Sequence, residues 1–440
     1  MVSSLFLTEE WIGQRGDRFT GGSWRSFREV GKPGFSPGLF FFLIVASAEG
    51  NDDRGPMRVL IPTVTAGAGH LQAALALEEA WRLLRPTDEI RRVDVLDYTP
   101  RLYRRVYMKG YLKLIEHAPE VWGMFFKKSD NPEKIKEVTK FRRHSARMIA
   151  AKFVKEMLAF QPDVVLCPHF LPLEILGGVQ TRVRRRKRIF PFTVCIVTDF
   201  EAHALWMEPC ANLFCVAAEE TKARLVARGL ENEKVVVTGI PIAQKFSSRV
   251  NATAVRAEYK LRDDIPTLLV LGGGFGLGPV EEILNELNKV ETPVQVVVVC
   301  GRNEGLRKKL AGLEHRHSTR VLGFVTNMHE LMTVSDLILT KPGGLTTSES
   351  MAVGKPLMIL NPIPGQEAAN SDFLLEKGAA VKVNCLEDLP FKLGQLLNSK
   401  KLTQMSRAAR ALGKPRAAMD VCEETLKRFE AKQPAYSSTR

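Results

Sequence analysis

The chain has 440 residues, an apolar content of 45% and a formal net charge of +14 at pH 7. This length favours two domains over a single core, and the apolar content excludes a disordered or fibrous protein. No apolar run reaches the roughly 18 residues that a membrane-spanning helix needs. The seven cysteines are scattered, without a CxxC pair, which argues against a disulfide framework and against a zinc site.

The first 56 residues stand apart from the rest. The segment at 38–48, GLFFFLIVASA, resembles the apolar part of a short signal sequence. Met57, however, stands directly before the first apolar strand of the regular pattern. We therefore expect residues 1–56 to be an upstream start or a poorly ordered extension.

Short apolar strands alternate with helical segments along two successive stretches of the chain. We expect strands in the first stretch at 57–62, 92–96, 163–167, 192–197, 213–217 and 234–238, with a helix at 71–84. We expect strands in the second at 267–271, 294–300, 321–322, 337–340 and 357–360, and a last helix at 416–429. This alternation predicts an α/β protein with parallel sheets covered on both faces.

Two polar segments follow strands of the first stretch, where ligands of open α/β sheets bind. The glycine turn at 65–70 ends in Gly69 and His70, and a histidine at a helix start is placed to take a proton near neutral pH. Asp199 and His203 follow a later strand. Asp199 either orients His70 or caps local structure, and the sequence leaves both open.

A second glycine turn, GGGFG at 272–276, follows the first strand of the second stretch. Gly273, Gly274 and Phe275 lie in it. Neither this turn nor the first fits G-x-G-x-x-G, which removes the main support for a dinucleotide-dependent oxidoreductase. Its free amides suit a diphosphate.

The segment 339–370 is the most informative part of the chain. Gly343 and Gly344 follow a buried strand and allow a ligand to approach the backbone. Hydroxyl residues from Thr346 onward are expected at a helix start, where phosphate oxygens bind well. Glu349 is placed to accept hydrogen bonds from a ribose diol. A loop then leads to three further hydrogen-bonding side chains suited to a sugar: Gln366, Glu367 and Asn370.

TKPGGLTTSESMAVGKP and PIPGQEAAN in this segment resemble the donor half of the monogalactosyldiacylglycerol synthases and processive diacylglycerol glucosyltransferases, in glycosyltransferase family 28. The resemblance implies the GT-B fold, in which two Rossmann-like domains face each other across a cleft. It implies an N-terminal acceptor domain at 57–242, a UDP-sugar donor domain at 243–415, and a crossing helix and tail at 416–440.

The resemblance also assigns roles. It makes His70 the candidate base and places the segment with His203 and Trp206 over the cleft. It puts Asn303 at the donor edge, and Phe324 and Val325 beside a uracil. Lys341 is placed to neutralise a diphosphate, although a salt bridge elsewhere is an equal alternative.

Residues 101–155 hold 15 Lys and Arg against 5 Asp and Glu. Tyr107, Tyr111 and Trp122 lie among these basic residues, as suits the surface of an anionic membrane. The alternative is an amphipathic helix whose aromatic side chains face the core. No recognition module for nucleic acid is present in the sequence.

The sequence thus predicts an inverting glycosyltransferase that moves a hexose from a UDP-sugar to diacylglycerol. We expect it to be cytoplasmic and peripheral at the inner face of the cell membrane, with no permanently bound cofactor and no strict need for a metal. Three alternatives stay open: transfer of N-acetylglucosamine to a polyprenyl-linked acceptor, UDP-sugar epimerisation, and a catalytically silent lipid-binding protein. The sequence specifies neither the donor sugar nor the number of sugars added.

Overall fold

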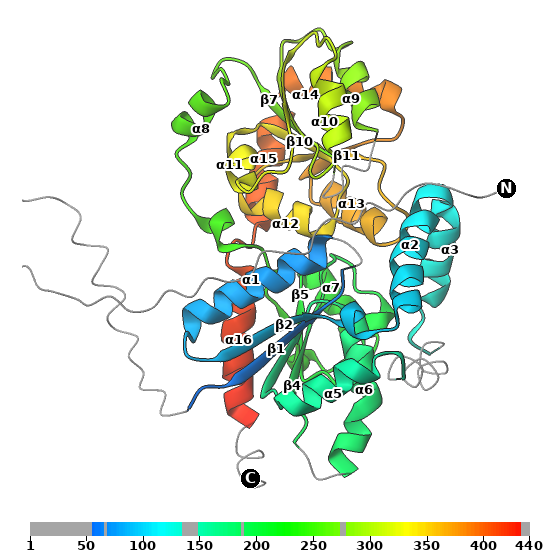
Figure 1. The fold of residues 1–440 in the computed structure, drawn as a ribbon. Coiled ribbons are helices and arrows are strands. Elements are labelled where there is room, and N and C mark those ends of the chain that lie inside the picture. Colours follow the sequence, from blue (N-terminus) through cyan, green and yellow to red (C-terminus); the bar gives the residue numbers. More distant parts are fainter. Residues whose placement is uncertain (1–54, 66–67, 134–147, 186–188, 273–278, 433–440) are drawn as a thin grey trace, which may run out of the picture. The chain divides into compact units, whose positions relative to one another are not determined.

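A computed structural model describes residues 55–65, 68–133, 148–185, 189–272 and 279–432. Predictions for residues 1–54 and for the tail after residue 432 lie outside these ranges. Contacts divide the chain after Gly55, and residues 56–440 form one unit. This unit holds two six-stranded sheets with helices packed on them (Figure 1).

The first sheet has the order β2-β1-β3-β4-β5-β6, and every neighbouring pair is parallel. Its strands are β1 (Arg58–Thr63), β2 (Glu89–Asp94), β3 (Val164–Cys167), β4 (Phe192–Ile196), β5 (Leu213–Val216) and β6 (Val235–Val237). The central strands are fully buried, which explains their continuous runs of apolar residues.

The second sheet has the order β12-β11-β10-β7-β8-β9 and is also entirely parallel. Its strands are β7 (Thr267–Leu271), β8 (Gln295–Val299), β9 (Ser318–Leu322), β10 (Leu337–Thr340), β11 (Leu357–Leu360) and β12 (Ala380–Val383). Two parallel sheets with crossover helices confirm the predicted α/β class.

Helices of the first half are α1 (Ala68–Leu84), α2 (Arg101–His117), α3 (Pro119–Ser129), α5 (Ala151–Phe160), α6 (Phe170–Arg185) and α7 (Glu219–Ala227). Helices of the second half are α8 (Ala252–Glu258), α9 (Val280–Leu287), α10 (Glu304–Ala311), α11 (Met328–Val334), α12 (Gly344–Ala352), α13 (Gln366–Glu376), α14 (Leu389–Leu397), α15 (Lys401–Leu412) and α16 (Ala417–Lys432). Short 3-10 segments are η2 (Val95–Tyr98), η3 (Ala204–Trp206), η4 (Asn232–Lys234), η5 (Gln244–Ser247) and η6 (Leu386–Asp388).

The last helix, α16, packs on the first sheet rather than on the second, and Figure 1 shows it running beside that sheet. Val421, Cys422 and Phe429 lie in the same apolar core as Leu77 and Trp81 of α1. The end of the chain therefore covers the sheet with which the chain begins.

Several expected boundaries differ from the structure; the strand predicted at 321–322, for example, spans Ser318–Leu322. The strand predicted at 92–96 lies at Glu89–Asp94, because the Asp94 carboxylate accepts from the Leu96 amide and starts a 3-10 turn there. Helix α1 begins at Ala68 instead of Leu71, which places His70 within its first turn. The short strand β12, with only two of four residues buried, was missed by the sequence pattern.

Candidate active site

The first turn of α1 holds His70 at the carboxyl end of the first sheet. Its Nδ1 lies 3.0 Å from the carbonyl oxygen of Pro168, which follows β3, and 3.1 Å from the hydroxyl of Thr198, which follows β4. Two strand ends therefore fix the imidazole. Because a carbonyl oxygen only accepts, Nδ1 must carry the proton, and the Nε2 lone pair is left for chemistry.

Burial lowers the pKa of His70 below its usual value, against the opposing effects of the Asp199 charge and the bond to Pro168. At neutral pH the ring is therefore uncharged, as a general base requires. Burial likewise raises the pKa of Asp199, opposed by His70 and by a hydrogen bond from Asn370. Asp199 thus acts on His70 through its charge.

Asn370 lies in α13, and its side chain joins the two halves of the chain. Its amide nitrogen donates to Asp199 Oδ1 and to the Pro342 carbonyl, both at 3.1 Å, and its Oδ1 accepts from the Phe200 amide at 2.8 Å. It is fully buried. Both polar atoms of the Asn370 side chain thus bond within the protein, and its predicted role as a sugar ligand stays a prediction.

His169 was not found from the sequence. Its ring packs edge-on against that of His70, with centroids 4.6 Å apart, and stacks on Phe170. Its Nδ1 accepts from the Leu171 amide, and burial holds its pKa well below the usual value. An uncharged His169 ring therefore packs against His70, the candidate base. The signal was available, since Pro168 and His169 directly follow a buried strand.

The first turn of α12 faces this group from the second half of the chain. A Cβ added to Gly344 would lie 2.1 Å from the Thr198 carbonyl oxygen, whereas one added to Gly343 would meet nothing within 4 Å. Gly344 thus serves the contact between the halves, and open space lies at Gly343. On the α1 side, a Cβ added to Gly69 would lie 3.9 Å from the Cβ of Leu345.

Because α12 begins at Gly344, its hydroxyl residues lie further into the helix than expected. Thr346 is partly buried in the first turn, and the Ser348 hydroxyl donates to the Gly344 carbonyl. The free amides of a helix N-terminus still point out of this turn. The Ser348 hydroxyl is therefore occupied by a hydrogen bond within α12.

Glu349 carries an unusual carboxyl group. Burial raises its pKa to about 8, and only the charge of Lys245 opposes this. Within the described part of the chain no hydrogen bond of its side chain is recorded. Hydrogen bonds donated by a diol would stabilise the ionised form of this carboxyl group, which fits the predicted ribose contact.

Gln366 and Glu367 form the start of α13. The Glu367 carboxylate accepts from the Ile363 amide at 2.8 Å, and burial raises its pKa while Lys341 opposes the shift. Gln366 Oε1 lies 3.4 Å from the indole nitrogen of Trp122 in α3. Lys341, Glu367 and Asp199 therefore influence one another electrostatically.

The remaining donor candidates lie along the second sheet. Asn303 caps α10, and its Oδ1 accepts from the Leu306 amide at 2.9 Å. Phe324 is 63% exposed, which excludes ordinary core packing, and the Arg302 guanidinium lies 5.4 Å from its ring centre. Val325 is partly buried beside it. Gly273, Gly274 and Phe275 lie outside the described residues.

The aromatic and histidine candidates on the acceptor side face inward. His203 is buried and contacts the Phe126 carbonyl at 3.1 Å, while Trp206 lies in the core of the first sheet. Tyr107 packs against that same core. His203 thus contacts the end of α3, whereas Trp206 and Tyr107 pack in or against the core of the first sheet. The side chain of Tyr111 is not among those described.

Among the described residues no group of three or more His, Cys, Asp or Glu side chains could hold a metal ion. None of the helices in those ranges is long and apolar enough to cross a membrane.

Family models match both halves of the chain. Residues 70–242 match monogalactosyldiacylglycerol (MGDG) synthase, and residues 267–421 match the glycosyltransferase family 28 C-terminal domain. The processive diacylglycerol β-glucosyltransferase of Bacillus subtilis is 31% identical over 387 residues, which cover 86% of this chain and 98% of that protein. The chain therefore belongs to the family of the monogalactosyldiacylglycerol synthases and processive diacylglycerol glucosyltransferases, in glycosyltransferase family 28.

Solved structures with the same fold are more distant in sequence. MurG of Acinetobacter baumannii has a TM-score of 0.55 at 20% identity, covering 84% of this chain and all of that one. The calicheamicin glycosyltransferase CalG4 has a TM-score of 0.53 at 16% identity, covering 85% and 99%. These likenesses confirm the GT-B fold predicted for this glycosyltransferase. A UDP-GlcNAc 2-epimerase from Neisseria meningitidis shares it too, with a TM-score of 0.53 at 16% identity and 84% of this chain covered, so the fold alone does not exclude epimerisation.

Proposed function

We propose that this glycosyltransferase moves a hexose from a UDP-sugar to the free hydroxyl of diacylglycerol, with inversion at the anomeric carbon. The observation that carries the proposal is the His70 ring: Pro168 and Thr198 hold its Nδ1, its Nε2 has no partner among the described residues, and Gly69 beside it lies near Leu345 in the first turn of α12. Relatives that match almost along their whole length are named diacylglycerol β-glucosyltransferases.

His70 would take the proton of the acceptor hydroxyl at Nε2 as the oxygen attacks the anomeric carbon. The bond from that carbon to the β-phosphate oxygen breaks, and UDP leaves with the electron pair. The sugar of a UDP-hexose is α-linked, so a single displacement gives a β-glycoside. Asp199 stabilises the imidazolium that forms, because its charge raises the pKa of His70.

The departing diphosphate would lie at the N-terminus of α12, beside Gly343, where free amides and the helix dipole favour negative charge. Lys341 adds a positive charge at the same edge, and Glu349 receives the ribose. This arrangement supplies charge stabilisation without assigning a step to a metal. We accordingly divide the unit into an acceptor domain at 57–242, a donor domain at 243–415 and a crossing segment at 416–440.

The acceptor is a lipid, and helices α2 and α3 supply a surface for its membrane. Their exposed apolar side chains are Leu102, Val106, Val121, Met124 and Phe125. Exposed basic side chains flank them at Arg101, Arg105, Lys127 and Lys128. Apolar groups between cations suit the headgroup region of an anionic membrane. We place the enzyme there, at the cytoplasmic face where UDP-sugars are available.

The opposite face of α3 touches the donor half of the site. A Cβ at Gly123 would lie 2.7 Å from the Pro364 Cβ, and Phe126 packs on Gly365, whose φ is +99°. Trp122 reaches Gln366 from the same face. The proposed membrane helix is therefore in direct contact with the loop that leads into α13.

The test is to incubate the full chain with UDP-glucose, UDP-galactose or UDP-N-acetylglucosamine and with vesicles that contain or lack diacylglycerol. UDP release and lipid products are measured, with and without EDTA. We expect release that depends on diacylglycerol, gives a glycolipid and persists in EDTA. Release on a polyprenyl phosphate acceptor alone, or epimerised UDP-sugar without lipid product, would overturn the proposal.

A further inference from the structure

The two faces of helix α3 have different surroundings. Val121, Met124 and Phe125 are exposed and belong to the proposed membrane surface. Trp122 and Phe126 are four residues apart and therefore share a face of the helix, and both are partly buried against the second half of the chain. The membrane surface accounts for the outer face of α3 and leaves the inner face unexplained.

The inner face of α3 lies very close to the loop before α13. A Cβ added to Gly365 would lie 2.9 Å from Cγ of Phe126, and the positive φ of Gly365 is one that other residues rarely adopt. On the opposing helix, Gly123 is equally close to Pro364. A glycine on each side thus allows the helix and the loop to approach, and this contact fixes the start of α13 relative to α3.

Trp122 makes the polar contact of this face. Its indole Nε1 donates a long hydrogen bond of 3.4 Å to Oε1 of Gln366, the first residue of α13. An indole N–H can only donate, so the carboxamide of Gln366 must turn its oxygen toward Trp122. The carboxamide nitrogen, with its two N–H donors, then points away from the indole. Trp122 therefore determines which end of the carboxamide faces away from α3.

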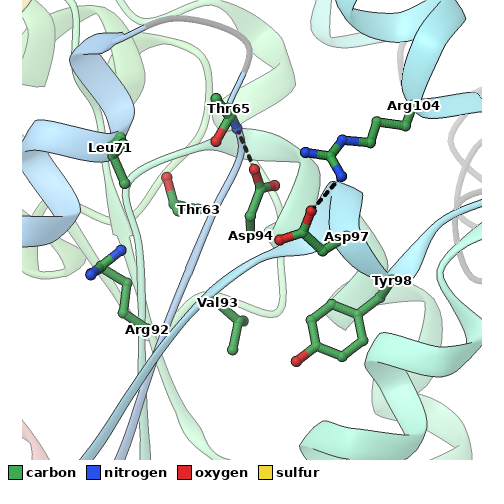
Figure 2. A pocket seen from close by; sticks show the side chains of 9 residues that line it. All are labelled: Thr63, Thr65, Leu71, Arg92, Val93, Asp94, Asp97, Tyr98 and Arg104. Carbon is green, nitrogen blue, oxygen red and sulfur yellow. Dashed lines mark hydrogen bonds and ion pairs between the residues drawn. The ribbon is translucent and has the colours of Figure 1, made fainter. Parts of the chain in front are cut away.

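The pair of helices α2 and α3 is attached to the first sheet where α2 begins. Tyr103 and Tyr107 pack against the core of that sheet. Arg104 also donates to Asp97 at 2.7 Å, as Figure 2 shows. This ion pair is exposed and contributes little by itself, so the tyrosines supply most of the attachment.

Asp130 attaches the other end of the pair, directly after α3. Its carboxylate accepts from both terminal nitrogens of Arg228, at 2.7 and 2.8 Å, and from the Ala204 amide at 2.8 Å. Burial would raise the pKa of Asp130, but these hydrogen bonds outweigh it and lower the pKa below its usual value. Asp130 is therefore ionised at neutral pH. Because Ala204 lies in the segment that follows Asp199, α3 is fixed to the candidate site at this end.

We propose that Trp122 is a positioning residue for the donor, which orients Gln366 so that its carboxamide nitrogen donates to a hydroxyl of the hexose in the UDP-sugar. This inference rests on the proposed function and deepens it, because it gives a residue of the acceptor half a role in binding the donor sugar. UDP itself carries no hexose, so its affinity is independent of Trp122.

The experiment replaces Trp122 by Phe, which keeps an aromatic ring on the inner face and removes the N–H donor. Titration calorimetry without lipid measures the Kd of UDP and of each UDP-hexose that supports transfer. We expect the Kd for UDP-hexose to rise about three- to tenfold, the effect of one hydrogen bond, and the Kd for UDP to be unchanged. The KM for dioleoylglycerol in vesicles should also be unchanged.

Two further variants separate positioning from a structural role. In a Gln366→Ala background, Trp122→Phe should not change the Kd for UDP-hexose any further, because Trp122 acts through Gln366. Trp81→Phe is the matched control, since Trp81 donates its indole N–H to Asp88 at 2.8 Å in the core of the first sheet. The control should lower the Tm but leave the Kd of both ligands unchanged.

An unchanged Kd for UDP-hexose in Trp122→Phe, an equal rise in the Kd for UDP, or an additive effect in the Gln366→Ala background would each overturn this inference and leave the proposed function standing. A rise confined to the KM for dioleoylglycerol would overturn it as well and make Trp122 an acceptor residue. Absence of transfer by the wild type with every UDP-hexose would instead overturn the proposed function.

Discussion

The starts of α1 and α12 have the same strand–turn–helix arrangement but carry different polar side chains. Each follows a buried parallel strand through a glycine-containing turn, and they meet where Gly69 approaches Leu345. The α1 turn carries an imidazole that neighbouring strand ends hold by hydrogen bonds. The α12 turn carries no base but has open space at Gly343 and, one turn on, the carboxyl of Glu349. Under our proposal, one local architecture supplies both the base and the diphosphate site.

The largest effect is expected from removing the base. His70→Ala should lower kcat by about 10²- to 10⁴-fold, the usual contribution of a general base, without changing the Kd for UDP. Steady-state transfer and calorimetric UDP binding measure the two quantities. His315→Ala, which removes a partly buried histidine bonded to the Leu310 carbonyl, is the control and should retain activity. Loss of UDP binding together with transfer would mean that His70 is structural.

Glu349→Gln tests the α12 side. The substitution keeps the size but removes the charge that a ribose diol would stabilise, so the Kd for UDP should rise by roughly tenfold or more at pH 8.5. In the wild type, affinity should increase as pH rises toward about 8, because ligand binding favours the ionised form of a carboxyl whose pKa is about 8. The variant should lack this dependence, as titration calorimetry at several pH values would show. A dependence that persists in the variant would assign it to another group.

The same carboxyl affects stability. Its pKa is raised in the folded protein, so the folded state holds the proton more tightly, and stability falls as pH rises from about 4.5 to about 8. Glu349→Gln should therefore be more stable than the wild type at pH 8 and lose that advantage near pH 4.5. Thermal unfolding at both pH values measures the difference. Equal Tm differences at the two pH values would contradict the raised pKa.

Two neighbouring glycines at the start of α12 allow the contact between the two halves to be tested separately from donor binding. Gly344→Ala would drive a Cβ into the Thr198 carbonyl, so we expect a lower Tm and roughly tenfold slower transfer. Gly343→Ala has open space around the new atom, so the Tm should be unchanged while the KM for UDP-sugar increases. Unfolding curves and donor titrations of the pair suffice. Identical Tm values for the two variants would contradict the contact that we assign to Gly344.

The smallest effect concerns Asp199. Its charge raises the pKa of His70, so Asp199→Asn should shift the acid limb of the rate profile to lower pH, with a several-fold lower kcat. The pH dependence of kcat/KM shows the direction of the shift. A shift to higher pH would contradict the charge interaction.

Much of the fold could be predicted from the sequence, because buried parallel strands leave continuous apolar runs such as those of β4 and β8. The edge strand β12 could not, since a half-buried strand of four residues lacks that pattern. Within the candidate site, His70 and Glu349 could be proposed from the sequence because each stands beside a glycine turn after a strand, and their roles stay predictions.

Other residues depend on contacts that no local pattern encodes. Asn370 is predicted as a sugar ligand, and its hydrogen bonds with Asp199 and Phe200, which lie about 170 residues away in the chain, could not be foreseen from the sequence. Thr198 and His169 support His70 only because the sheet order places β3 next to β1 and β4 next to β3, so that the ends of these strands lie near the start of α1. Tyr103 and Tyr107 of α2 pack on the core, whereas other apolar residues of α2 and α3 are exposed.

The most direct test of this account is the protonation state of His70 at pH 7, observed by ¹⁵N NMR of histidine-labelled protein and assigned through His70→Ala. The account predicts a neutral ring with the proton on Nδ1 and an unprotonated Nε2, because the Pro168 carbonyl accepts from Nδ1 and burial lowers the pKa. An imidazolium, or a neutral ring with its proton on Nε2, would leave no base facing the start of α12 and would contradict it.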